Sequence, residues 1–129
     1  MIDTKVFEDI LDIEQDIFLN EATSEELERL EEYANNKCVL ASIDLCGFYI
    51  KHNQMEIFEK EFARTKKIIS NAGPYELYLI GVMLYDLTDE KYQEEAKEYF
   101  RKSSELDFEA SKEFLEFIRK SEEDDYPFC

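Results

Sequence analysis

The chain has 129 residues and carries 32 acidic against 15 basic side chains, which gives a formal net charge of −17 at pH 7. This length suits one domain with one hydrophobic core, and ten Phe and eight Tyr argue against disorder along the whole chain. The negative charge argues against binding to nucleic acid or to an anionic membrane, because both interactions need a basic surface.

Seven helices are predicted from the spacing of apolar residues, and the chain has only three Gly and two Pro, fewer turn residues than sheets need. The first helix covers 2–19, and the capping box Thr23–Glu26 starts a second, which stops at Asn35-Asn36. The remaining helices are expected at 37–52, at 54–70, from Pro74 through Leu84, at 89–105 and at 108–120. Residues 121–129 are expected to form a flexible acidic tail.

A period of 34 residues relates these helices. A shift by 34 places Gly47 on Gly81 and, in the following helix, Phe58 on Tyr92. Helix pairs with such a period bury their apolar faces by stacking on one another. Glycine inside a helix costs ~1 kcal/mol of propensity, so close packing of helices is the expected reason for both glycines. The predicted fold is all-α, with stacked antiparallel helix pairs in an α–α superhelix. It forms one helical-repeat domain over 1–120, in which 1–36 is a divergent acidic pair.

The clearest copy of the repeat has Leu79-Ile80-Gly81 in its first helix, and Ala96, Tyr99-Phe100 and Ser103-Ser104 in its second. This order of a small residue, an aromatic pair and a small pair resembles the Sel-one-like repeat of the tetratricopeptide superfamily, over roughly 40–118. The glycine-rich turn of that family is replaced here by "DLTDEKY". The resemblance implies a curved α–α scaffold that binds proteins or peptides and has no catalytic role.

The acidic residues are concentrated at both ends of the chain. Residues 1–36 carry twelve acids and two bases (net −10), residues 37–70 four and six (net +2), and residues 71–129 sixteen and seven (net −9). Carboxylates recur at helical spacing in three rows, which are Asp9, Asp12 and Asp16, then Glu25, Glu28 and Glu32, and finally Glu109, Glu113 and Glu116. Like charges at these spacings destabilise a helix by a few tenths of a kcal/mol each. The rows fit either a surface for a basic protein or a solvated face.

The 34-residue register also predicts an inner surface, because the first helix of each pair lines the concave side of such a superhelix. The positions that the core does not use are Asp44, Phe48 and Lys51 in one copy and Tyr78, Val82 and Tyr85 in the next. Exposed aromatic residues are typical of binding hot spots. Alternatively, the first two helices fill this groove.

No catalytic, cofactor or metal site is predicted. His52 is the only histidine and stands where a helix ends, which suits the helix dipole. Cys38 and Cys46 are expected to be small core residues, and no cluster of Cys or His has the spacing of a zinc site. Paired carboxylates are uninformative in so acidic a chain, and a small metal-dependent hydrolase remains an alternative.

Cellular location follows from the lack of targeting signals. No apolar run approaches the ~18 residues of a membrane span, and residues 1–10 lack the pattern of a signal peptide. The cysteines number three, with Cys129 the last, and an odd count without a secretion signal is typical of reduced thiols. We therefore expect a cytoplasmic protein.

Two binding functions fit these features. The small size and segregated acidity resemble the immunity proteins of bacterial toxin systems. This resemblance implies an inhibitor that is monomeric alone, and that forms a heterodimer with a basic toxin, such as a nuclease, by covering its active or nucleic-acid-binding site. Charge steering would speed that encounter. The alternative is an adaptor or chaperone that binds a peptide in an aromatic concave groove.

Overall fold

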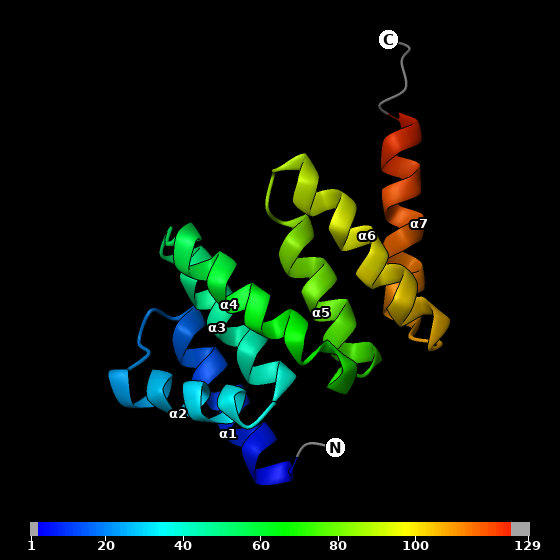
Figure 1. Ribbon diagram of the computed structural model, residues 1–129. Coiled ribbons are helices and arrows are strands. Elements are labelled where there is room, and N and C mark those ends of the chain that lie inside the picture. The colour runs from blue at the N-terminus through cyan, green and yellow to red at the C-terminus, as the bar shows by residue number, and fades with distance from the viewer. Residues whose placement is uncertain (1–2, 125–129) are drawn as a thin grey trace. The chain divides into compact units, whose positions relative to one another are not determined.

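The structure is a computed structural model that describes residues 3–124. Over these residues the chain forms seven α helices, one short 3-10 helix and no strand, which confirms the predicted all-α fold (Figure 1). The helices are α1 (Thr4–Phe18), α2 (Ser24–Asn35), α3 (Val39–Lys51), α4 (Met55–Lys67), the 3-10 helix η1 (Ile69–Asn71), α5 (Pro74–Tyr85), α6 (Glu90–Glu105) and α7 (Glu109–Asp124).

Local signals place most helix ends where the sequence predicts them. The Glu26 amide donates to Thr23 Oγ1 over 3.1 Å, and the Thr23 amide donates to Glu26 Oε1 over 2.9 Å, so the predicted capping box is confirmed. Pro74 is the first residue of α5, where its fixed φ suits a helix start. α4 ends at Lys67, three residues before its predicted end. α7 continues to Asp124, so 121–124 of the predicted tail is helical, and 125–129 lies outside the described residues.

Two compact units make up the chain, Met1–Asn71 and Ala72–Cys129. In each unit neighbouring helices pack against one another, an arrangement compatible with a helical-repeat fold. The single repeat domain over 1–120 stays a prediction. Among residues 3–124, no helix is long and apolar enough to cross a membrane.

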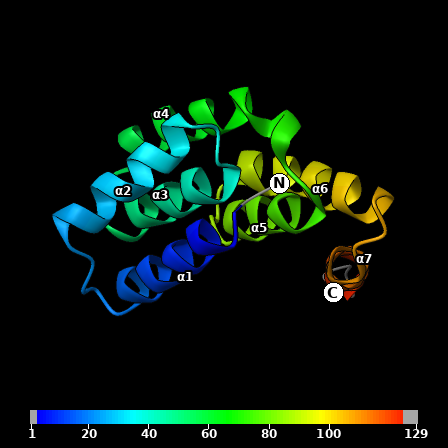
Figure 2. The ribbon, with the colours of Figure 1, turned by 90° about the horizontal axis from the view of Figure 1, so that it is seen from below.

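In the first unit α3 is the central helix, and it packs against α1, α2 and α4 (Figure 2). All eight residues from Val39 to Cys46 are buried, so this half of α3 has no solvent face. The predicted core role of Cys46 is confirmed, and burial raises the pKa of its thiol to about 12. Cys38 is half-buried at the start of α3.

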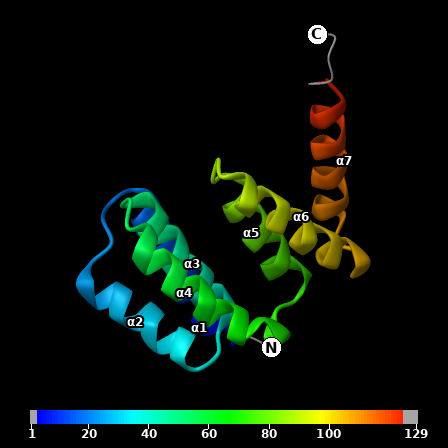
Figure 3. The same cartoon turned by 45° about the horizontal axis from the view of Figure 1, so that its top comes forward.

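In the second unit α6 packs against both α5 and α7 (Figures 1 and 3). Phe100 of α6 is fully buried, and its ring stacks on Phe114 of α7 with centroids 4.5 Å apart. Ser103 Oγ donates to the Pro74 carbonyl over 2.7 Å, and Ser111 Oγ donates to Ser103 Oγ over 2.7 Å. The aromatic and small residues of α6 therefore fill the spaces toward both neighbouring helices.

The two glycines related by the 34-residue shift have different surroundings. A Cβ atom added to Gly81 would lie 2.7 Å from Cε1 of Phe100, a separation that real Cβ atoms do not tolerate. A Cβ atom added to Gly47 would meet nothing within 4 Å. Close packing therefore explains Gly81, whereas the same prediction for Gly47 is wrong, because no neighbouring side chain approaches that face of α3.

Candidate functional site

The row Asp9, Asp12 and Asp16 on α1 does not present one continuous face to solvent. Arg29 of α2 donates to both carboxylate oxygens of Asp9 over 3.0 Å, and Tyr33 Oη donates to Oδ2 over 2.6 Å. These bonds lower the pKa of Asp9, with the Arg29 bond as the largest cause. Asp9 thus joins α1 to α2, while Asp12 remains exposed.

Asp16 lies half-buried at the end of α1 that meets the start of α2. Its carboxyl group shares a hydrogen bond with Glu26, which raises the pKa of Asp16 and lowers the pKa of Glu26. The negative charges of Glu26, Glu21 and Asp12 also raise the pKa of Asp16. Negative charge is therefore concentrated between α1 and α2.

All three residues of the row on α2 are exposed. Glu25, Glu28 and Glu32 follow one another at i, i+3 and i+7, so they lie on one face of the helix. None of the three side chains forms an ion pair within the part of the chain that the structure describes. We call these three residues the acidic stripe.

The row on α7 is also exposed, and one of its members is paired within its own helix. Glu109 and Glu113 lie at the surface, and Glu116 accepts a hydrogen bond from Arg119 Nε over 3.2 Å. This bond lowers the pKa of Glu116. The row therefore offers fewer free carboxylates than the acidic stripe.

Asp44 of α3 is part of the core, so the prediction that it lies outside the core is wrong. Its side chain is 9% exposed, and its Oδ2 atom has no hydrogen-bond partner among the described residues. Burial is the largest cause, and together with the negative charge and hydrogen bonding of Glu14 on α1 it raises the pKa of Asp44 to about 9. Asp44 is therefore protonated at neutral pH.

Asp44 gives the protein's stability a defined pH dependence. The folded-state pKa lies above the value of ~3.9 expected for the unfolded chain, so between pH 4 and 9 the folded state holds the extra proton. Asp44 consequently reduces the free energy of unfolding as pH rises through this window. Asp44→Asn should raise that free energy by about 1–3 kcal/mol at pH 8 and by much less at pH 4. Urea unfolding at pH 4 and pH 8 measures this difference, and Asp12→Asn, at an exposed carboxylate of α1, is the control. An equal change in the free energy of unfolding at the two pH values would contradict the prediction.

The other two inner-surface positions of the first unit contact neighbouring groups. The ring of Phe48 lies 4.4 Å from the ring of His52. Lys51 Nζ donates to the carbonyl oxygens of Ile17 over 2.9 Å and Phe18 over 2.6 Å, at the end of α1. Helix α1 thus lies against α3, as the filled-groove alternative predicts.

The predicted aromatic positions of the second unit are half-buried by α7. The ring of Tyr78 lies 6.4 Å from Phe114 and 5.4 Å from Phe108, and the ring of Tyr85 lies 5.5 Å from Phe114. Val82 is half-buried on the same helix. The structure therefore brings these residues together around Phe114 instead of leaving them in an open aromatic groove.

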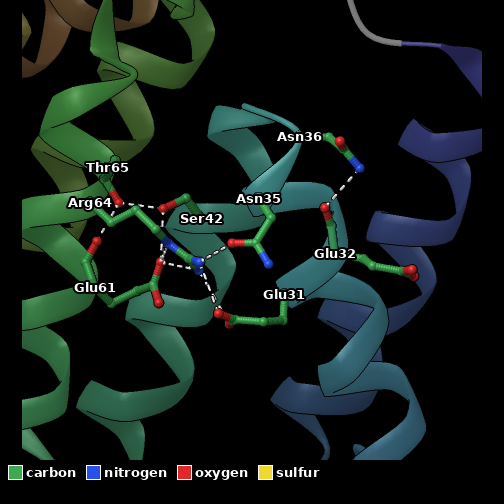
Figure 4. Close-up of polar contacts among 8 residues, drawn as sticks. All are labelled: Glu31, Glu32, Asn35, Asn36, Ser42, Glu61, Arg64 and Thr65. Atoms are coloured by element: carbon green, nitrogen blue, oxygen red, sulfur yellow. Dashed lines mark hydrogen bonds and ion pairs between the residues drawn. The ribbon is translucent and has the colours of Figure 1, made fainter.

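A polar cluster between α2, α3 and α4 was not predicted from the sequence (Figure 4). Glu61 is 8% exposed and accepts hydrogen bonds from Ser42 Oγ over 3.1 Å and from Arg64 Nε over 2.8 Å. Arg64 also donates to Glu31 Oε1 over 2.8 Å and to Asn35 Oδ1 over 2.7 Å. The cluster therefore joins α2, α3 and α4 through hydrogen bonds and through the ion pairs of Arg64 with Glu31 and Glu61.

A cavity of about 460 Å³ lies in the second unit, lined by residues of α5, α6 and α7. Lys97 lies at this cavity and forms ion pairs with Glu94 over 3.4 Å and with Glu122 over 3.1 Å. Between residues 3 and 124, no group of three or more His, Cys, Asp or Glu side chains is placed to hold a metal ion.

Comparison with protein-family models, with curated protein sequences and with solved structures finds no match to this chain. The resemblances to the Sel-one-like repeat and to immunity proteins therefore stay expectations. Residues 3–124 form helices that pack against their neighbours, and the whole chain carries a formal net charge of −17.

Proposed function

We propose that this chain is a non-catalytic protein-binding module that inhibits a basic protein by holding it against α1 and α2. The observation that carries the proposal is the acidic stripe, three exposed carboxylates on one face of α2 without an internal cation. Solubility alone does not require charges in rows, since neighbouring like charges weaken a helix. A basic partner would remove that repulsion.

The class of partner follows from the charge. A protein with a basic surface large enough to match a net −10 over residues 1–36 is typically one that binds nucleic acid. A row of carboxylates on a helix resembles a row of phosphates in sign and in regular spacing. The partner we propose is therefore a nuclease, and the inhibitor acts by covering the surface that would bind the nucleic acid. A toxin of this kind would need rapid neutralisation, which electrostatic steering provides.

Affinity capture from a lysate of the source organism tests this function. The immobilised protein is washed first at low and then at high salt, and the captured proteins are identified. A dedicated inhibitor should retain one basic protein that high salt releases. That protein should cleave nucleic acid alone and lose this activity on addition of one equivalent of the chain. Several partners that survive high salt would instead indicate an adaptor.

A further inference from the structure

Helix α1 has a second apolar row besides the one that it buries. The buried row is Ile10, Ile13 and Ile17. On another face of the helix, Leu11 is 39% exposed and Phe18 is 74% exposed. Half-buried Phe7 stands four residues before Leu11, which stands seven before Phe18, so the three side chains share this face. We call Phe7, Leu11 and Phe18 the outer row.

The outer row remains at the surface after the first unit has folded. Helix α1 packs against α2 and α3, and Figure 2 shows it along one edge of the unit, beside α3. Single exposed apolar side chains are common on proteins, but a row over about three helical turns is typical of a helix that also packs on this second face. The Lys51 ammonium lies 5.4 Å from the centroid of the Phe18 ring, a contact that holds the ring at the end of the row.

Glu14 completes the spacing of a seam between two helices. Phe7, Leu11, Glu14 and Phe18 are separated by four, three and four residues, the spacing with which seam positions recur in coiled coils. A second helix can therefore pack along this face over about 16 Å of the helix axis. A charged residue at a seam position selects a partner that pairs with it. This face thus fits an apolar helix that carries a cation opposite Glu14.

Charge favours a basic partner over a second copy of this chain as the occupant. Glu8 and Glu14 are both exposed, and each lies three residues from Leu11 on the helix surface. A second copy would bring the same carboxylates against them, or would place Glu14 against an apolar side chain, and both arrangements are costly. A helix with Arg or Lys beside its apolar seam would pair with these acids, and the net −10 of residues 1–36 would attract it.

We propose that the outer row and Glu14 form the docking site for an amphipathic helix of the basic partner. The apolar side chains of that helix pack against Leu11 and Phe18, and an arginine or lysine lies opposite Glu14. This inference rests on the proposed function and names the segment of the partner that α1 holds. The acidic stripe on α2 speeds the encounter through charge, whereas the outer row supplies the apolar contacts that slow dissociation.

A synthetic peptide of three heptads tests the site before the partner is known. It carries Leu at the seam positions, one central Arg within the seam, and Lys beside it. A scrambled peptide of the same composition and charge has no continuous apolar face. Binding is followed by ¹⁵N NMR at about 150 mM salt, which screens attraction by net charge. We expect the amphipathic peptide to shift the amides of residues 7–18 saturably, and to bind at least ~10-fold more tightly than the scrambled peptide.

Two double variants locate the contact on α1. Leu11→Gln with Phe18→Gln removes two exposed apolar side chains of the outer row. Leu106→Gln with Phe117→Gln removes two from the second unit, where these residues are 55% and 57% exposed. All four side chains lie at the surface, so the helix content by circular dichroism should stay unchanged. We expect the first double variant to bind the amphipathic peptide at least ~10-fold more weakly, and the second to bind it as the unaltered chain does.

No saturable binding of the amphipathic peptide, equal binding of the two peptides, shifts centred outside α1, or equal losses in the two double variants would overturn the docking site. A dimer of the chain that Leu11→Gln with Phe18→Gln dissociates would also overturn it, because a second copy would then cover the outer row. If this double variant releases a captured basic nuclease no faster than the unaltered chain, the docking site is wrong and the proposed function stands. If the peptides behave as expected but no basic protein is captured, the helix-binding site stands and the proposed function fails.

Discussion

Gly81→Ala is expected to lower the free energy of unfolding by about 1–3 kcal/mol, the usual cost of inserting a methyl group into a filled core. The new Cβ atom would lie 2.7 Å from the Phe100 ring. That ring is fully buried and stacked on Phe114, so it cannot move aside without disturbing the contact between α6 and α7. Urea unfolding followed by circular dichroism measures the change.

Gly47→Ala is the matched control, because both glycines lie inside a helix and occupy the same place in the 34-residue register. Nothing lies within 4 Å of the added methyl group at Gly47. Alanine should therefore stabilise the protein by up to ~1 kcal/mol through helix propensity. In a Phe100→Ala background, Gly81→Ala should lose most of its cost. If Gly47→Ala and Gly81→Ala changed the free energy of unfolding in the same direction, close packing against Phe100 would not explain Gly81.

Arg64→Ala is expected to lower the free energy of unfolding by roughly 3 kcal/mol, as when one partner of a buried ion pair is removed. The carboxylate of Glu61, which is 8% exposed in the intact protein, would keep only Ser42 as a side-chain donor. The contacts of Arg64 with Glu31 and Asn35 on α2 would also be lost. The measurement is again the urea midpoint and slope, which together give the free energy.

Arg29→Ala offers a comparison of similar chemistry at a more exposed place. Arg29 also makes two hydrogen bonds to one carboxylate, that of Asp9, but its side chain is 44% exposed. Water can replace its bonds, so the expected loss is below about 1 kcal/mol. If Arg64→Ala and Arg29→Ala lowered the free energy of unfolding equally, burial of the Glu61 carboxylate would not be the source of the stability that the polar cluster provides.

Helices and their ends were predictable because their signals are local. Apolar residues three and four apart define a stripe, and the Thr23 capping box and Pro74 fix two starts. The exposure of the acidic stripe was predictable for the same reason. Glu25, Glu28 and Glu32 lie between the apolar residues of α2 in sequence, and therefore outside the buried stripe of an amphipathic helix. Such evidence needs no knowledge of which other helix is adjacent.

Tertiary partners were not predictable from spacing. Arg29 lies 20 residues from Asp9, and Arg64 lies 33 from Glu31, so neither pairing leaves a pattern in the sequence. Asp44 was misplaced because α3 is apolar over most of its circumference, which gives no period from which to read an outer face. The repeat register likewise relates Gly47 to Gly81 but carries no information on how closely another helix approaches each.

In the proposed function, the acidic stripe guides a basic protein onto the first unit. This guidance is tested most directly by the association rate constant of the captured partner at about 20 mM and about 300 mM salt. The triple variant Glu25→Lys, Glu28→Lys, Glu32→Lys is compared with Glu109→Lys, Glu113→Lys, Glu116→Lys on α7, which changes the net charge equally.

We expect the α2 variant to associate at least ~10-fold more slowly than the unaltered chain at low salt, and high salt to remove most of the difference. The α7 variant should associate at nearly the rate of the unaltered chain. Equal slowing by both variants would show that net charge acts without a defined surface. Rates that neither variant changes would show that the carboxylates serve solvation alone, and either result would contradict the claim.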